Sequence, residues 1–114
     1  MLTLAGRAKI FICREPINLR KSFDGLSDIV TEHFKEDITG GSYFVFINRA
    51  RDFMKVLYFD GDGLAIWAKR LEKGRFGQAE GKDKTIERRE MLMLLEGVTP
   101  SKISKRFKLK NPLK

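Results

Sequence analysis

Three closely spaced apolar segments in the middle of the chain constrain the fold more than any other feature of the sequence. They are SYFVFIN at 42–48, FMKVLYFD at 53–60 and LAIWAKRL at 64–71, and only the short polar sequences RARD and GDG separate them. Aromatic and β-branched residues dominate these segments, which is typical of strands, and connections this short join antiparallel neighbours. The sequence therefore predicts an antiparallel β-meander.

The predicted strands are apolar on both faces. In the first of them, Tyr43, Val45 and Ile47 share one side, and Phe44 and Phe46 lie on the other. A sheet with one wet face would alternate apolar with polar residues, so both sides must be covered. We expect two helices to pack on one face, and either a partner subunit or closure of the sheet into a small barrel to cover the other.

The remaining patterns predict one more strand and these two helices. RAKIFIC at 7–13 alternates as a strand does, Asn18 caps a helix from about Leu19 to Phe34, and EMLMLLEG predicts a helix near 88–96. The charged, glycine-containing sequence KGRFGQAEGKDK predicts a mobile loop. The fold class is therefore α+β, with an antiparallel sheet of about four strands in the order β-α-β-β-β-α.

Each predicted helix has an apolar stripe that we expect to be buried. The stripe of the first helix comprises Leu19, Phe23, Leu26, Val30 and Phe34, and that of the second comprises Met91, Leu92, Leu94, Leu95 and Val98.

Charge divides the chain into two parts. Residues 1–98 carry 17 Lys/Arg against 15 Asp/Glu, whereas residues 99–114 carry 6 against none. We therefore expect a single domain at 1–98 and a basic, flexible C-terminal tail at 99–114. The asymmetry favours a polyanionic partner, and nucleic acid before a membrane, because the tail has no strong amphipathic stripe. A tail that only improves solubility is the alternative.

Cations also gather within the predicted domain. Arg49 and Arg51 lie in the first meander turn, and WAKRLEKGRF brings further cations to the end of the third strand, at the same edge of the sheet. Cations at a strand exit can hold phosphates while Trp67 or Phe76 stacks on a base. Ordinary solvated charges are the alternative reading of this pattern.

Two more cations stand in the stretch NLRKSFDGL. Arg20 and Lys21 fall in the first turn of the predicted helix, where free N–H groups favour anions, so we expect a phosphate site there. Pairing of Arg20 with Asp24 would also explain them. The candidate nucleic-acid-binding residues are Arg20, Lys21, Arg49, Arg51, Lys69, Arg70, Lys73 and Arg75 in the domain, and Lys102, Lys105, Arg106 and Lys108 in the tail.

The sequence does not favour catalysis, a metal or a cofactor. His33 is the only histidine, and we expect it to be a partly buried structural residue. A magnesium site formed by Asp60 and Asp62 with Asp24 is the alternative, but DGDG is more typical of a tight hairpin turn. Cys13 is the only cysteine, which excludes an internal disulfide. With no secretory signal and no membrane-spanning run, we expect a cytoplasmic protein.

Several blocks also resemble a known family. NLRKSFDGL, YFVFINRARDFMKVLYFDGDGLAIWAKRLEKGRF and LLEGV are similar, in order and spacing, to the small accessory protein often called TnpB. That protein is encoded beside the transposase of bacterial insertion sequences of the sixty-six family, and it is unrelated to the RNA-guided nuclease with the same label. The resemblance covers about residues 5–98, although 77–85 lacks the proline-containing stretch often seen in the family.

The resemblance implies a role in transposition. Such proteins are needed together with a DDE-type transposase and a second small accessory protein, and the family has no established catalytic residues to transfer. We therefore expect a non-catalytic accessory protein that binds nucleic acid, in particular the DNA at the element ends, and helps to assemble the transposase complex. The alternative is an adaptor that binds the transposase, or associates with its own copy as a homo-oligomer, without touching DNA.

Overall fold

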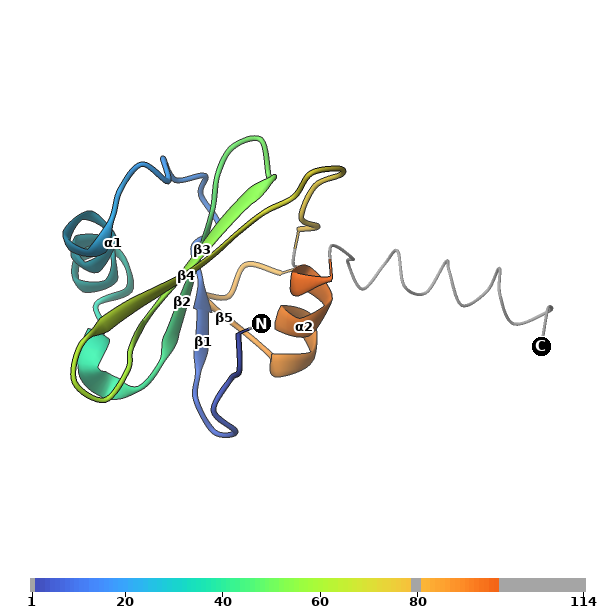
Figure 1. Ribbon diagram of the computed structural model, residues 1–114. Helices are drawn as coiled ribbons and strands as arrows, with labels where there is room; N and C mark the ends of the chain where they lie inside the picture. The colour runs from blue at the N-terminus through green and yellow to red at the C-terminus, as the bar shows by residue number, and fades with distance from the viewer. Residues whose placement is uncertain (1, 79–80, 97–114) are drawn as a thin grey trace, which may run out of the picture.

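A five-stranded sheet lies between two helices in the computed structural model, which describes residues 2–78 and 81–96 (Figure 1). The elements in chain order are β1 (Ile10–Ile12), α1 (Phe23–Ile29), a π-helical turn (Val30–Phe34), a 3₁₀ turn (Ile38–Gly40), β2 (Tyr43–Ile47), β3 (Phe53–Phe59), β4 (Leu64–Arg70), β5 (Thr85–Ile86) and α2 (Arg88–Leu95). None of the helices in these ranges is long and apolar enough to cross a membrane.

The sheet has the strand order β4-β3-β2-β1-β5. The predicted meander is confirmed, because β2, β3 and β4 are antiparallel neighbours. The expectation of a purely antiparallel sheet of about four strands is wrong, since β1 pairs with β2 in parallel and β5 adds a fifth strand beside β1. The segment between β1 and β2 contains α1, and a connection through a helix returns the chain to the same end of the sheet, so the two strands run the same way.

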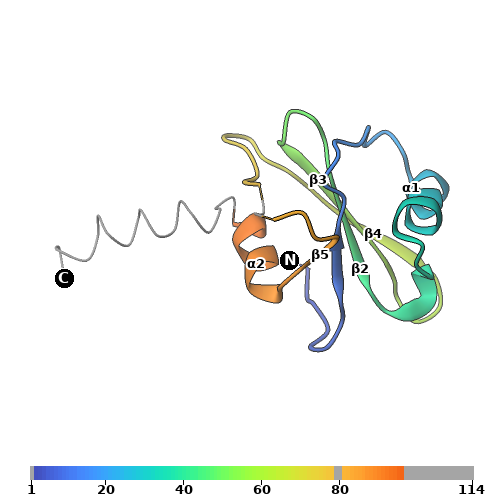
Figure 2. The ribbon, with the colours of Figure 1, turned by 180° about the vertical axis from the view of Figure 1, so that it is seen from behind.

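The two helices cover opposite faces of the sheet, as the views from both sides show (Figures 1 and 2). This corrects the expectation that both helices share one face and that a partner or a closed barrel covers the other. On the α1 face, the buried residues include Phe11, Phe44, Phe46 and Leu57 from the strands and Leu26, Val30 and Phe34 from the helical segment. On the α2 face, they include Val45, Ile47, Met54 and Val56 from the strands and Met91, Leu94 and Leu95 from the helix.

The first helix begins later than predicted. Asn18 accepts a hydrogen bond at its Oδ1 from the N–H of Arg20 (3.0 Å), and its main-chain carbonyl accepts one from the N–H of Lys21 (3.2 Å). These bonds close a tight turn, so α1 starts only at Phe23, which is 43% exposed rather than buried. The π-helical turn that follows has Lys35 as its C-cap and leaves His33 exposed, which corrects the expectation of a partly buried histidine.

The second helix matches its predicted position, with one change of face. A capping box between Glu87 and Glu90 begins it. Met93 is buried and Leu92 is 44% exposed, the reverse of the predicted stripe. Val98 and the predicted tail lie outside the described residues, so the domain boundary at residue 98 stays a prediction.

The loop after β4 is anchored, against the expectation of a mobile segment. Phe76 is 1% exposed and belongs to the core on the α2 face. Its N–H donates to the carbonyl of Arg51 at 2.6 Å, so the loop is tied to the turn between β2 and β3. Farther along the same segment, Lys84 accepts a hydrogen bond at its carbonyl from the N–H of Ile12 at 2.7 Å, which aligns β5 with β1.

Candidate nucleic-acid interface

The turn between β2 and β3 is held by the side chain of Asn48. Its Oδ1 accepts hydrogen bonds from the N–H groups of Asp52 and Phe53, both at 3.1 Å, and its Nδ2 donates to Asp52 Oδ1 at 2.8 Å. A side-chain amide can satisfy several main-chain groups in this way and replace a regular two-residue hairpin turn. Arg49 lies in this ordered turn, and Phe53 follows it as the first residue of β3.

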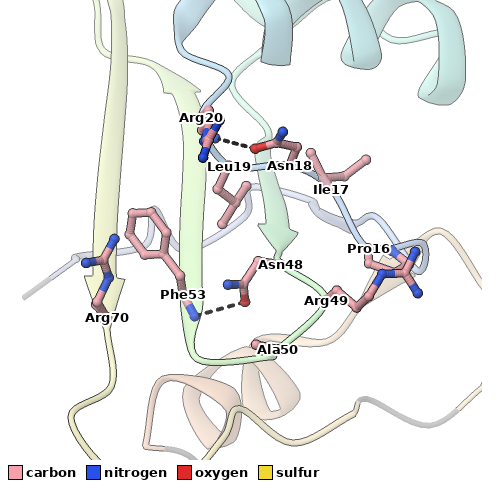
Figure 3. Close-up of a pocket in the computed structure, with 10 residues that line it drawn as sticks. All are labelled: Pro16, Ile17, Asn18, Leu19, Arg20, Asn48, Arg49, Ala50, Phe53 and Arg70. Carbon is pink, nitrogen blue, oxygen red and sulfur yellow. Dashed lines mark hydrogen bonds between the residues drawn. The ribbon is translucent and has the colours of Figure 1, made fainter.

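A cleft of about 650 Å³ opens beside this turn (Figure 3). We call it the arginine cleft; it is lined by Pro16, Ile17, Asn18, Leu19, Arg20, Asn48, Arg49, Ala50, Phe53 and Arg70. Three cations reach it from three segments that are far apart in the sequence: the turn before α1, the β2–β3 turn and the end of β4. None of the lining residues is acidic.

Main-chain contacts bring the turn that carries Arg20 to the end of the meander. The N–H of Ile17 donates to the carbonyl of Ile47 at 3.1 Å, which runs the segment before α1 alongside the end of β2. Lys55, on β3, donates from Nζ to the carbonyl of Lys21 at 2.9 Å. The position of Arg20 is thus fixed from two neighbouring strands.

The cleft combines free cationic groups with an aromatic surface. The guanidinium carbon of Arg70 lies 4.7 Å from the centroid of the Phe53 ring, a cation–π contact that holds both side chains in the cleft. Among the residues that the structure describes, the guanidinium groups of Arg20 and Arg49 have no hydrogen-bond or ion-pair partner. Guanidinium groups bind phosphate through paired hydrogen bonds, and Phe53 and Leu19 provide an apolar wall for a base or sugar.

Arg51 lies next to the cleft but is engaged in the fold. Its Nε donates to the carbonyl of Phe76 at 2.9 Å, and a second guanidinium nitrogen donates to the carbonyl of Gly77. Burial lowers the pKa of this guanidinium from its ordinary value, but arginine stays charged near neutral pH because that value is so high. Arg51 thus fastens the loop after β4 rather than offering its charge to a ligand.

We expect Arg51→Ala to lower the free energy of unfolding by about 1–3 kcal/mol, because two buried carbonyls lose their donors. Chemical denaturation followed by circular dichroism measures this change. Arg49→Ala is the matched control in the same turn, and we expect it to stay within about 0.5 kcal/mol because Arg49 is exposed. Equal effects of the two substitutions would contradict the anchoring role of Arg51.

The structure does not bring all of the predicted cations together. Lys69 and Arg70 point to opposite faces of β4, and Lys69 Nζ donates to the carbonyl of Leu95 at 2.8 Å, at the C-terminal end of α2. Lys73, Arg75 and Lys21 are exposed outside the cleft lining. The tail residues Lys102, Lys105, Arg106 and Lys108 lie outside the described part of the chain.

The expected phosphate site at a helix N-terminus is not formed. The N–H groups of Arg20 and Lys21 are used within the Asn18 turn, and the helix begins after them. The alternative, an ion pair between Arg20 and Asp24, is also absent from the described residues. Arg20 contributes to the arginine cleft through its side chain alone.

The remaining expectations from the sequence concern a metal site, the DGDG turn and the cysteine. Within residues 2–78 and 81–96, no three His, Cys, Asp or Glu residues gather as metal ligands. The DGDG sequence forms a hairpin turn, as expected: the N–H of Asp60 donates to the carbonyl of Gly63 at 2.7 Å, and Gly61 has a φ of 68°. Cys13 is buried, and burial raises the pKa of its thiol, which makes it a poor nucleophile.

Sequence reasoning missed the aromatic residue of the cleft. It named Trp67 and Phe76 as stacking partners, but Phe76 is buried and Trp67 packs against the core on the α2 face. Phe53 stands directly opposite Arg70 in the β3–β4 register. Counting back along the meander from the short GDG turn would have identified this pair.

One family profile and two relatives match most of the chain. The sequence profile of the family described as "IS66 Orf2 like protein" matches residues 8–105, which runs past the predicted domain boundary. The uncharacterized protein y4hO of Sinorhizobium fredii (strain NBRC 101917 / NGR234) is 32% identical over 100 residues, which cover 86% of this chain and 87% of the relative. The uncharacterized protein y4jC of the same organism is 29% identical over 108 residues, which cover 93% and 92% of the two chains. No solved structure matches the chain.

Proposed function

Because the chain belongs to the IS66 Orf2-like family, which implies an accessory role in transposition, we propose that it serves that role as a non-catalytic protein that binds nucleic acid through the arginine cleft. The proposed ligand is DNA at the ends of the insertion sequence, held by its phosphates. The bound protein helps to assemble the complex of the transposase and a second small accessory protein.

One observation supports this proposal above the others. Arg20, Arg49 and Arg70 all line a single cleft that has no acidic residue and has the Phe53 ring on its wall (Figure 3). Carboxylates that would neutralise the arginines as a structural network are missing from the lining. Cations left without such partners around an aromatic surface are suited to a sugar–phosphate backbone, and they read no base sequence.

The adaptor alternative has lost the observation that favoured it. It depended on an apolar sheet face with no cover, whereas α1 and α2 cover the two faces of the described sheet. Contact with the transposase belongs to the proposed assembly of the complex. We expect the transposase to be captured equally well by the native chain and by a variant with a neutralised cleft.

The test is fluorescence-anisotropy binding of the full chain to labelled duplex and single-stranded oligonucleotides across a salt series. The cleft variant carries Arg20→Ala, Arg49→Ala and Arg70→Ala together. Each phosphate contact contributes about 0.7–0.9 to the slope of log K against log salt, so we expect the slope to become shallower by about 2–3. Binding at about 0.1 M salt should weaken at least roughly tenfold.

A matched variant removes the same charge elsewhere. Arg7, Lys82 and Arg89 are exposed cations outside the cleft lining, and all three are replaced by Ala in the control. The tail is present in both variants, so its contribution cancels in the comparison. Equal losses in the two variants would mean that net charge alone drives binding, and the arginine cleft would be rejected as the site.

A further inference from the structure

The two edges of the sheet differ in length and composition. β5 forms one edge with only Thr85 and Ile86, whereas β4 forms the other over Leu64–Arg70. The part of β4 at 64–68 reads LAIWA and contains no charge, proline or glycine. Natural proteins shorten, charge or cover edge strands because an unprotected edge pairs with other chains. β5 is protected because it is short, whereas β4 is longer and its 64–68 part is uncharged.

The hydrogen-bond pattern shows which groups of β4 are left over. At the two ends of the β3–β4 hairpin, Leu71 N–H donates to the Asp52 carbonyl at 2.7 Å, and Asp60 N–H donates to the Gly63 carbonyl at 2.7 Å. Antiparallel bonding alternates along a strand, so Ala65, Trp67 and Lys69 bond to β3. The N–H and carbonyl groups of the alternate residues point away from the sheet: these are Leu64, Ile66, Ala68 and Arg70.

We propose that β4 pairs with β4 of a second copy of this chain, antiparallel, with Trp67 opposite Trp67 of the second copy. In this register Ile66 faces Ala68 and Leu64 faces Arg70 across the pair. All of the outward-pointing N–H and carbonyl groups then receive partners, and the two sheets become one continuous sheet. The symmetry is a two-fold axis, the commonest arrangement for a dimer of identical chains.

Opposite charges at the two ends of β4 favour a second copy of this chain as the partner, and they favour an antiparallel orientation of the two strands. Arg70, Lys73 and Arg75 lie at the C-terminal end with Glu72, and Asp60 and Asp62 lie in the turn before the N-terminal end. Antiparallel pairing places the basic end of one copy beside the acidic turn of the other. Parallel pairing would place like charges together, which is unfavourable across a strand pair.

The arrangement also positions the arginine clefts. A two-fold axis through a pair of antiparallel strands stands perpendicular to the sheet, so equivalent faces of both copies lie on the same side. Arg70 stacks on Phe53, which packs against the α1-face core. Both clefts therefore open on one side of the dimer. The pairing itself requires no nucleic acid, so it can be tested separately from the proposed function.

Sedimentation velocity of the full chain over a concentration series tests the pairing. The native protein is expected to form a species of twice the 13.2 kDa chain mass. Ala68→Pro removes an outward N–H without removing a β3–β4 hydrogen bond, because the residue before it and the residue after it make those bonds. We expect Ala68→Pro to raise the dissociation constant at least about tenfold, and Ala68→Thr, which keeps the N–H, to change it less than about twofold.

Two further measurements keep the proposal open to refutation if the proline variant folds poorly. Asp60→Asn with Asp62→Asn removes the acidic end but keeps turn-forming residues, and we expect it to weaken the dimer about two- to tenfold at low salt. Trp67 is the only tryptophan, so its fluorescence should change with concentration over the same range as the mass. The proposal would be overturned if the protein kept the mass of a single chain up to about 100 μM, far above the dissociation constants of specific interfaces. A dimer that Ala68→Pro leaves intact would overturn it as well.

Discussion

Replacing Phe76 by Ala is expected to lower the free energy of unfolding by about 3–5 kcal/mol, a large part of the 5–15 kcal/mol typical of a domain. The side chain is 1% exposed and packs with the core on the α2 face. Its removal leaves a cavity that the anchored backbone cannot fill, because the N–H and the carbonyl of Phe76 are both bonded to Arg51. Urea denaturation followed by far-ultraviolet circular dichroism measures the change.

Lys73→Ala is the matched control for this prediction. Lys73 lies in the same loop and is exposed, so its replacement should change the free energy of unfolding by less than about 0.5 kcal/mol. The glycines and charges of the loop predicted a mobile segment, and in such a segment the two substitutions would have similar, small effects. If Phe76→Ala proves as mild as Lys73→Ala, the loop is not part of the core.

Local patterns predicted the meander because its determinants are local. Each strand and turn of β2–β4 can be identified within about ten residues, and short turns leave only one way to pair. The parallel pairing of β1 with β2 depends instead on where the chain returns after α1. The assignment of α1 and α2 to opposite faces depends on that same path, and no spacing within either helix reports it.

The candidate site was predictable in part for the same reason. Arg49 and Arg70 were expected at one edge of the sheet because the meander register places them there, and both line the cleft. Strand alternation could also have separated Lys69 from Arg70, since successive side chains point to opposite faces. Arg20 could not be placed from its own sequence, because the bond from Ile17 to Ile47 that positions its turn joins distant segments.

The start of α1 was misplaced because two local signals competed. Asn18 can cap a helix, but it can equally hold a turn through its own side chain, and the latter occurs. Phe23 then begins the helix instead of lying in its second turn, and it is exposed. Phe34, from the same predicted stripe, is 4% exposed.

The difference in burial between Phe34 and Phe23 leads to the final prediction. Phe34 lies on the α1 face with its ring centroid 5.6 Å from that of Phe11, 5.5 Å from Phe44 and 6.3 Å from Phe46. We expect Phe34→Ala to lower the free energy of unfolding by about 3–5 kcal/mol, since it opens a cavity and removes these ring contacts. Phe23→Ala should cost less than about 1 kcal/mol, because a side chain that is 43% exposed gains little from folding.

Both substitutions remove the same atoms from residues that one helical stripe would bury equally, so their difference reports the geometry of the segment. Thermal and urea denaturation of the two variants measures this difference. The dependence of the free energy of unfolding on urea concentration should be the same in both variants, which checks that the same cooperative transition is compared. Phe34 ends the π-helical turn at Val30–Phe34 and packs with the strands of the α1 face, while His33 stays exposed. Equal costs for the two substitutions would contradict the different burial of Phe34 and Phe23, and with it the start of α1 at Phe23.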